Sequence, residues 1–456
     1  MSTSFVVISG GSACNYVARA FHENSKNNVC YVLGIADNGG STSEILRVLG
    51  GPSIGDLRSR LTKLMDIMDD TQTPERRAIK ELLSHRLPAN APEQAVKDEW
   101  ASIVEGRHRL WDSISVEKKE AIRGFLTSFN FEILKRAHKR FKFCNGSIGN
   151  FFLTGARLFF GSLEAALFLF SAITGISEPT TVVPVINTNH TATIAALLEN
   201  GDTLVGQCEI SHPSPSSRIS KNCAARKRTN PIDAFTHLTE DDDEAFFEES
   251  NNLCFSKEAG EKLVSRIQRI HYINEYAQEI YPIPNPKVIS HLSQKQTLVY
   301  SIGSLYTSIV PCLVLRNVGN TIAHSTSLQH KIFLLNGSND RETTDYTALD
   351  FIQTVTLALN ESQRIDARRA FYQSSMAGSP TLHYPPFPDN LFFPSPPSSF
   401  ITHLIYLHNS AVSVDLQRIE KLGIQCIKIQ GIWSDDGLPV YSESALTKAI
   451  QSIVCK

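Results

Sequence analysis

Disulfide frameworks and zinc sites find little support in this sequence. Only nine cysteines occur among 456 residues, they are scattered, and no two of them form a C-x-x-C pair. An odd, scattered set in a chain long enough to bury a large core indicates reduced thiols. Reduced thiols are typical of the cytoplasm and the nucleus. We therefore expect a cytoplasmic protein, with the nucleus as the second candidate compartment.

An excess of one charge and a long uninterrupted apolar run are also absent. The chain has 44 Lys and Arg against 46 Asp and Glu, a formal net charge of −2, which argues against coating nucleic acid or an anionic membrane. Residues 165–177 are too short to span a bilayer, and residues 296–315 are interrupted by Ser, Thr, Gly and Pro. The N-terminus has no secretory signal pattern. The sequence thus predicts neither a nucleic-acid partner nor a membrane.

What the chain does have begins with a β-rich run that ends in glycines, FVVISGG at residues 5–11. Residues 12–25 follow as a candidate helix, and residues 28–37 form a second, nearly continuous apolar run. Runs of this kind suit parallel strands that are buried on both faces. The succession predicts a Rossmann-like α/β fold with a doubly wound, mostly parallel sheet and a helical insertion.

The insertion is the charged, helically spaced segment at residues 67–143. We interpret it as a helical insertion or lid, although a solvated helical face without a role in chemistry explains the same pattern. Residues 1–66 and 144–456 then form the α/β domain. Two loops are expected within it: the acidic, low-complexity residues 211–252, predicted to be disordered, and the Pro-rich residues 375–400.

Other elements follow from periodicity and turn residues. The apolar stretch before residue 177 predicts two buried helices divided at Gly161–Ser162, with Ser162 as an N-cap. The Asn200–Gly201 pair between two apolar runs predicts a hairpin. We expect helices over residues 261–277 and 343–360 and a strand over residues 296–303.

Small residues in SGGSACN, from Ser9 to Asn15, stand at the turn after the first strand. The backbone N–H groups of Gly10, Gly11 and Ser12 could approach a phosphate there. The motif is neither G-x-G-x-x-G nor a Walker P-loop, because no Lys follows it. A tight turn without a ligand also explains the glycines.

Asp37 ends the second strand, at the edge where open parallel sheets bind their ligands. An acid in this place can hold Mg²⁺ or accept a proton from a substrate hydroxyl. Asp56, after Gly55, repeats the pattern one helix later. The phosphate-binding candidates between these acids are Asn38, Gly39, Gly40 and Ser41. In the alternative interpretation, Asp37 and Ser41 only cap one helix, and Gly55–Asp56 is the turn and N-cap of the next.

Two further segments combine Gly with polar side chains. NGSIGN, ending in Gly149 and Asn150, precedes an apolar helix, and Arg58 and Arg157 could reach an anion there, although such arginines more often pair with an acid. YSIGSLYTSIVP ends a strand at Gly303. Its hydroxyl groups suit a phosphate or a ribose and belong to Ser304, Tyr306, Thr307 and Ser308. One shared ligand cleft explains these segments better than unrelated turns do.

The chain resembles the CofD-like family, also called UPF0052, in a series of sequence blocks. They occur in the order VVISGGSACN, ADNGGSTSEILR, GDLRSRL, NGSIGNFFL, YSIGSLYTSIVPCLV and KIFLLNGSNDRETTDYTALDFI. The resemblance covers most of the chain except the insertion and the two loops. It implies a Rossmann-like nucleotide-binding domain with its site at the carboxyl ends of the strands. One branch of the family is a Mg²⁺-dependent 2-phospholactate transferase, which moves a phospholactyl group from a guanosine diphosphate carrier to a deazaflavin hydroxyl. Another branch, the gluconeogenesis factors, binds nucleotide sugars.

The resemblance can be carried over residue by residue. The positions that match the family's blocks are Gly10, Gly11, Ser12, Asp37, Gly39, Gly40, Ser41, Gly55, Asp56, Arg58, Gly149, Asn150, Gly303, Ser304, Leu305, Tyr306, Thr307, Ser308, Glu342 and Thr343. Among the departures, Asn38 stands where many members have a second acid, and Gln207 replaces a Glu. Each of these two changes removes a charge from the cleft.

The resemblance implies a Mg²⁺-dependent transferase of the 2-phospholactate transferase type, acting on a nucleoside-diphosphate-linked donor. Asp37 and Asp56 would hold the metal or act as the base. The residues that would bind the nucleotide are Gly10, Gly11, Ser12, Asn38, Gly39, Gly40, Ser41, Gly55, Arg58, Gly149, Asn150, Gly303, Ser304, Tyr306, Thr307 and Ser308. A non-catalytic regulator of carbon metabolism that binds a nucleotide or nucleotide sugar is the alternative, which Asn38 favours. A structural protein that binds no nucleotide comes third. The family suggests a homodimer.

Overall fold

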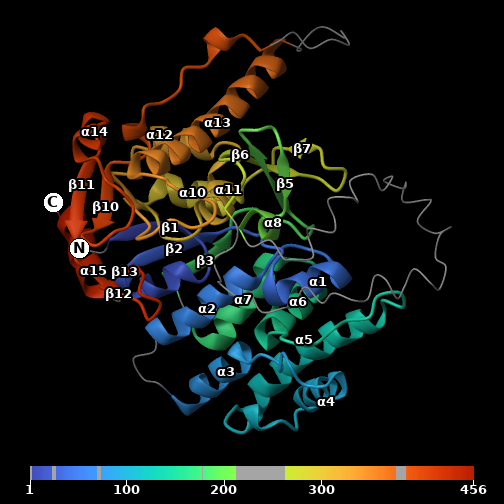
Figure 1. Cartoon of the computed structure of the whole chain (residues 1–456). Helices are drawn as coiled ribbons and strands as arrows, with labels where there is room; N and C mark the ends of the chain where they lie inside the picture. Colours follow the sequence, from blue (N-terminus) through green and yellow to red (C-terminus); the bar gives the residue numbers. More distant parts are fainter. Residues whose placement is uncertain are drawn as a thin grey trace.

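The computed structural model describes residues 3–22, 27–68, 73–176, 178–211, 262–375 and 387–455. Within these ranges, a parallel sheet of seven strands runs in the order β11-β10-β9-β8-β1-β2-β3 (Figure 1). Each neighbouring pair is parallel, which confirms the predicted Rossmann-like α/β class. The strands are β1 (Ser4–Ser9), β2 (Asn28–Leu33), β3 (Thr181–Pro184), β8 (Thr297–Tyr300), β9 (His330–Leu334), β10 (His403–Leu407) and β11 (Gln425–Ile429).

The order of the strands reverses at β1. The chain adds β2 and β3 on one side of β1, and β8 to β11 on the other. The side chains of β1 and β2 are buried from their second residue onward, as parallel strands covered on both faces require. In open α/β sheets, ligands bind beyond the carboxyl ends of the strands at such a reversal. This places the expected site beyond Ser9, Leu33 and Tyr300.

Helices cover both faces of the sheet. In Figure 1, one layer of helices lies above the sheet and a second layer lies below it. The upper layer consists of α10 (Pro286–Gln294), α11 (Val310–Leu313), α12 (Val318–His324) and α13 (Ala348–Ser375). The lower layer includes α1 (Gly40–Leu49), α2 (Gly55–Ile67), α6 (Ile148–Phe160) and α7 (Leu163–Thr174). The hydroxyl of Ser162 accepts a hydrogen bond from Ala165 N–H at 3.2 Å, which confirms the predicted N-cap of α7.

A helical region lies beneath the lower layer, formed by α3 (Pro74–Ser84), α4 (Glu93–Val104), η3 (Arg109–Trp111) and α5 (Val116–Leu134) (Figure 1). Stacked and edge-on rings join it to α6: Phe151 lies 4.5 Å from Phe129 and 5.1 Å from Trp100, centroid to centroid. Helices α5 and α6 approach so closely that a Cβ on Gly155 would lie 2.0 Å from the carbonyl oxygen of Phe125. Whether this region acts as a lid stays a prediction.

A smaller antiparallel sheet, in the order β5-β4-β6-β7, lies beside the upper layer (Figure 1). Its strands are β4 (Thr193–Leu198), β5 (Thr203–Val205), β6 (Ile267–Ile273) and β7 (Glu279–Ile280). Strands β4 and β5 pair across the Asn200–Gly201 turn, which confirms the predicted hairpin. The short helix α8 (Gln207–Ser211) follows β5. Near the C-terminus, α14 (Leu416–Lys421), the hairpin of β12 (Gly431–Trp433) and β13 (Pro439–Tyr441), and α15 (Glu443–Val454) complete the chain.

Two predicted helices are wrong. Residues 261–277 contain strand β6, because pairing with β4 along Ile267–Ile273 decides the conformation of a segment whose isoleucines also fit a helical period. The described part of the predicted helix 12–25, residues 12–22, forms two 3₁₀ turns, η1 (Ala13–Tyr16) and η2 (Ala18–Phe21), instead of an α-helix. Buried Cys14, Val17 and Ala20 recur every third residue, and Val17 N–H and Ala20 N–H bond to the carbonyl groups three residues earlier.

Nearly all of the predicted acidic loop, residues 212–252, and part of the predicted Pro-rich loop, residues 376–386, lie outside the described residues. The rest of the Pro-rich segment contains two short 3₁₀ turns, η7 (Asp389–Leu391) and η8 (Pro397–Ser399). No helix of the described chain is long and apolar enough to cross a membrane.

Candidate functional site

The turn after β1 is where three distant segments meet. A Cβ on Gly10 would lie 2.8 Å from Ser308 Oγ, and a Cβ on Gly303 would lie 3.4 Å from Gly10 N. A Cβ on Gly11 would lie 2.0 Å from the carboxylate oxygen Oδ1 of Asp56. Only glycine therefore fits at Gly11 without displacing Asp56.

Asp37 and Asp56 lie near enough at this edge for the charge of Asp56 to act on Asp37, and neither residue is fully buried. Asp37 follows β2 and accepts a hydrogen bond from Gly39 N–H at 2.9 Å. Burial, followed by the negative charge of Asp56, raises the pKa of Asp37 to about 7. Burial also raises the pKa of Asp56, against the opposing effects of Gly11 N–H, Arg60 and Arg58. Because it is unfavourable for both carboxyl groups to be ionised at once, such a pair favours binding of a cation or a proton.

The alternative in which these acids only cap helices is not what the structure shows. The N-cap residues of α1 and α2 are Gly39 and Ile54, and neither helix has a side-chain hydrogen bond at its cap. Asp56 lies within the first turn of α2, where a negative charge also favours the helix dipole. The Asp56 side chain lies against Gly11 and makes no capping hydrogen bond to α2.

A relay of polar side chains joins α1, α2 and α6 at the same edge. Arg58 Nε donates to Asn150 Oδ1 at 3.2 Å, and Asn150 Nδ2 donates to Ser41 Oγ at 3.0 Å. A Cβ on Gly149 would lie 2.9 Å from Arg58 Cδ, so the arginine packs directly on the start of α6. Burial, together with the charge of Arg86, lowers the pKa of Arg58 to about 10. Two neighbouring cations beside an open edge favour an anionic ligand.

The segment after β8 forms η6 (Leu305–Ile309), a single π-helical turn. Glu342 holds it: Oε2 accepts from Tyr306 N–H at 2.9 Å and from Thr307 N–H at 3.2 Å, and Oε1 accepts from Thr307 Oγ1 at 2.5 Å. Ser211 of α8 also donates to Oε1. Burial, followed by the charge of Asp340, raises the pKa of Glu342 to about 7.

The predicted residues differ in where their side chains lie. The phenol of Tyr306 points into the core, where it bonds to the carbonyl of Ile267 at 3.1 Å and to the hydroxyl of Tyr346 at 2.9 Å. Ser12 and Asn38 are exposed, while Ser304 and Ser308 are partly exposed at the edge. Contact with a ligand is therefore open to Ser12, Ser304 and Ser308, but not to the Tyr306 hydroxyl.

Asn38 ties the loop after β2 to α8. Its Oδ1 accepts a hydrogen bond from Cys208 N–H at 3.0 Å. A Cβ on Gly206, whose φ is +87°, would lie 2.6 Å from Asn38 Nδ2. The amide therefore has a structural partner. Arg157, the other arginine considered from the sequence, bonds to the carbonyl groups of Gly50 at 3.0 Å and Asn189 at 3.3 Å.

Two residues at the edge were not predicted from the sequence. Asn336, two residues after β9, exchanges hydrogen bonds with both backbone groups of Gly303, at 3.3 and 2.9 Å. Its position after a strand is the same signal that identified Asp37. Arg60, beneath the glycine turn, donates to Ser9 Oγ and to the carbonyl of Gly10, both at 3.3 Å. Its spacing of four residues from Asp56, on one face of α2, is the only sequence signal for it.

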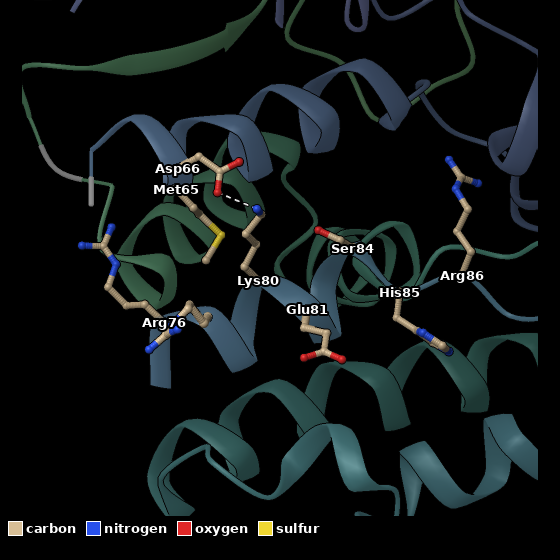
Figure 2. A pocket seen from close by; sticks show the side chains of 9 residues that line it. Met65, Asp66, Arg76, Lys80, Glu81, Ser84, His85 and Arg86 are labelled. Atoms are coloured by element: carbon tan, nitrogen blue, oxygen red, sulfur yellow. Dashed lines mark hydrogen bonds and ion pairs between the residues drawn. The ribbon is translucent and has the colours of Figure 1, made fainter. Parts of the chain in front are cut away.

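The described surface also has a cleft of about 680 Å³ between α2 and α3, away from the glycine turn (Figure 2). Its lysine and histidine have partners: Lys80 pairs with Asp66, and His85 bonds to Glu99 at 2.7 Å. Arg86, which also lines the cleft, acts electrostatically on Arg58 at the edge of the sheet. The other residues that line it are Met65, Arg76, Arg77, Glu81 and Ser84.

The geometry defines a class of protein: an α/β protein whose strand reversal carries glycine turns, hydroxyl groups and a pair of acids at one edge. The family model described as 2-phospho-L-lactate transferase CofD matches residues 5–431. The chain belongs to the CofD family, as its sequence blocks predicted.

Relatives extend this finding. An uncharacterized protein of Saccharomyces cerevisiae, YNL011C, is 38% identical over 447 residues, which cover 93% of this chain and 94% of that protein. Two crystal structures of protein BH3568 of Bacillus halodurans, a UPF0052 family member, resemble the fold with TM-scores of 0.58 and 0.59 at 16% identity. They cover 99% of this chain and 100% and 99% of theirs, respectively. At this identity the bacterial structures support the fold alone.

Proposed function

We propose that this protein is a transferase that acts on a donor linked to a nucleoside diphosphate. The observation that carries the proposal is the convergence of Asp37 and Asp56 with the Gly10–Gly11 turn, at the reversal point of the sheet. Membership of the family whose model is named for 2-phospho-L-lactate transferase supports a phospholactyl or related phosphoryl group as the one transferred.

In this proposal, the diphosphate lies between the turn after β1 and the turn after β8. The phosphate oxygens would meet the backbone of Gly10 and the partly exposed residues Ser304 and Ser308, and Ser308 Oγ would lie 2.8 Å from a Cβ on Gly10. Arg58, held by Asn150, adds a cation that can bind two phosphate oxygens at once. Positioning and electrostatics would then supply most of the rate enhancement.

Asp37 and Asp56 would hold Mg²⁺. The described residues contain no group of three or more His, Cys, Asp or Glu side chains arranged for a metal. The pair nevertheless fits Mg²⁺, which is commonly bound through one or two carboxylates together with waters and substrate phosphates. Burial and the charge of Asp56 raise the pKa of Asp37, and a bound cation would offset both effects. When bound, the ion would neutralise charge on the diphosphate.

In place of holding the ion, Asp37 can act as a general base. A carboxyl group with a pKa of about 7 can take the proton of an acceptor hydroxyl near neutral pH. The acceptor oxygen would form a bond to the distal phosphorus, the bond to the bridging oxygen would break, and a nucleoside monophosphate would leave with that electron pair. The proton would go to Asp37.

Calorimetric titration with GDP and UDP-sugars, with and without Mg²⁺, tests the proposal. For the wild type we expect Mg²⁺ to strengthen binding, and for Asp56→Asn we expect this gain to disappear. Asp37→Asn should lower the release of nucleoside monophosphate by roughly 10²- to 10⁴-fold, the usual loss of a general base. Asp436→Asn, in the exposed β12–β13 turn, is the matched control and should behave as wild type. Equal affinities with and without Mg²⁺ would remove the metal role.

A second candidate is a nucleotide-binding regulator without turnover. Asn38 favours it, because an amide stands beside Asp37 and is bonded to Cys208 N–H. Tight nucleotide binding without any released product, measured by ³¹P NMR over long incubation, would support the regulator. Any nucleoside monophosphate that appears in step with enzyme concentration would exclude it.

A further inference from the structure

Arg60 is a charged side chain that the fold leaves incompletely bonded. It lies on α2, one turn after Asp56, and is 0% exposed. Its two hydrogen bonds, from Nη2 to Ser9 Oγ and to the Gly10 carbonyl, are long at 3.3 Å. Among the described residues, Nε and Nη1 have no hydrogen-bond partner. The guanidinium carbon lies 4.6 Å from the ring centre of Tyr31.

Such an arrangement works against stability. An arginine stays protonated in proteins, and a buried charge without a close counter-ion is strongly unfavourable. In the described chain, no carboxylate forms an ion pair with Arg60, although Asp56 is near enough to interact with it electrostatically. His22, another titratable neighbour on which Arg60 acts, has a pKa lowered to about 4, by burial first and then by Arg60, and is neutral at pH 7. The positive charge of Arg60 is thus not neutralised by an ion pair.

Lys295, a second buried cation of the same sheet, can be compared with Arg60 for its hydrogen bonding. It is 4% exposed and lies just before β8, at the amino edge. Its ammonium group donates to the carbonyl of Asn28 at 3.2 Å and to Asn28 Oδ1. The contrast with Lys295 indicates that the charge of Arg60 serves to interact with a bound group that is not part of the chain.

We propose that Arg60 provides the positive charge for a diphosphate that binds at the Gly10–Gly11 turn. Since its side chain is fully buried, Arg60 does not touch the ligand. It is a positioning residue, which fixes the Gly10 carbonyl inward and attracts the anion through a medium of low dielectric constant. The turn therefore selects ligands by charge and prefers a diphosphate to an uncharged nucleoside. The nucleotide part of this role rests on the proposed function, whereas anion binding at the turn does not.

Calorimetric titration of the full chain with inorganic pyrophosphate, GDP and guanosine tests the inference. Arg60→Met should weaken pyrophosphate and GDP binding about tenfold or more and leave guanosine binding unchanged. Arg60→Lys, which keeps the charge, should recover most of the affinity. Lys295→Met is the matched control and should bind pyrophosphate as the wild type does.

Thermal unfolding separates this role from a structural one. Arg60→Met should melt at the wild-type temperature or above, because it removes two unpartnered donors, whereas Lys295→Met should melt lower. A lower melting temperature with unchanged pyrophosphate affinity in Arg60→Met would overturn the inference. If Arg60→Met does not fold, Arg60→Lys decides: pyrophosphate affinity within about threefold of wild type supports the role of charge, and a larger loss opposes it.

The two proposals fail separately. Pyrophosphate binding that depends on Arg60, without any nucleotide binding, would keep the inference and reject the proposed function. GDP binding of equal strength in the wild type and Arg60→Met would reject the inference alone. A wild-type protein that binds no pyrophosphate overturns the inference whatever the nucleotides do.

Discussion

The two edges of the parallel sheet treat their charged side chains in opposite ways. At the amino edge, Lys295 bonds to Asn28, and Lys331 of β9 donates to the carbonyl of Ser399 at 2.6 Å. At the carboxyl edge, burial and the charge of Asp56 raise the pKa of Asp37, and two nitrogens of Arg60 have no hydrogen-bond partner among the described residues. The amino edge shows that this fold can bond its buried charges. The unpartnered nitrogens of Arg60 at the other edge are therefore better explained by a ligand than by folding.

The largest effect is expected where the carboxyl edge has no spare room. Gly11→Ala would place a Cβ 2.0 Å from Asp56 Oδ1, so the carboxylate must move. A displacement of about 1 Å in a catalytic group can cost roughly 10²-fold in rate, and we expect a loss of this size in turnover or Mg²⁺-dependent binding. Gly34→Ala is the control, because a Cβ there meets nothing within 4 Å. Equal losses in both variants would contradict the tight fit at Gly11.

The pH dependence of stability tests whether the buried acids are protonated in the folded state. The pKa of Glu342 is raised from 4.5 to about 7, so the folded protein binds this proton more tightly than the unfolded chain does. Stability should therefore fall as the pH rises from about 4.5 to 7, by at most about 1.4 kcal/mol per pH unit for this group.

Glu342→Gln should remove this contribution and keep the hydrogen bonds to Tyr306 and Thr307, since an amide can both accept and donate. Urea unfolding at several pH values measures the slope. Asp37→Asn should reduce the slope in the same direction, because its pKa is also raised to about 7. A Glu342→Gln protein with the wild-type slope would mean that Glu342 is ionised when folded.

At the amino edge, stability should change while binding does not. Lys295→Met leaves the oxygen atoms of Asn28 without their donor, at a cost of about 2 kcal/mol in the free energy of unfolding. Denaturant titration measures this loss, and nucleotide titration should give the wild-type affinity. A change in nucleotide affinity would break the proposed separation of the two edges.

The smallest effect is expected at Asn38, where many members of the family have a second acid. Asn38→Asp adds a carboxylate beside Asp37 and retains an oxygen for Cys208 N–H. In the presence of nucleotide, Mg²⁺ affinity should rise by about threefold to tenfold, because affinity for hard cations grows with ligand charge. Weaker Mg²⁺ binding in this variant would place the metal elsewhere.

Local pattern was enough to predict the centre of the fold. The runs at residues 5–11 and 28–37 are apolar on both faces, and only a doubly covered strand buries such a run. It failed at residues 261–277, where the spacing of the isoleucines also suits a helix and only the partner strand β4 decides. It failed again after Gly11, where a period of three was mistaken for an α-helical period.

The site follows the same division. Asp37, Gly10 and Ser304 could be proposed because each comes directly after a strand, and the carboxyl ends of parallel strands share an edge. Arg60 could not be proposed, since its importance depends on how α2 packs beneath the glycine turn. Glu342 appeared in a sequence block, but its role as the acceptor of the Tyr306 and Thr307 N–H groups is set by tertiary structure.

The short helix α8 has a mechanical consequence for the whole site. Its Cys208 N–H is bonded to Asn38 in the loop after β2 on one side of the site. Its Ser211 hydroxyl is bonded to Glu342 and Thr307 on the other side. Arg341 adds a further tie to the carbonyl groups of Glu209 and Ile210, at 2.8 and 2.9 Å. The loop that contains Asn38 and the segments that contain Thr307 and Glu342 cannot move apart without breaking hydrogen bonds at α8. This helix therefore limits how far the site can open.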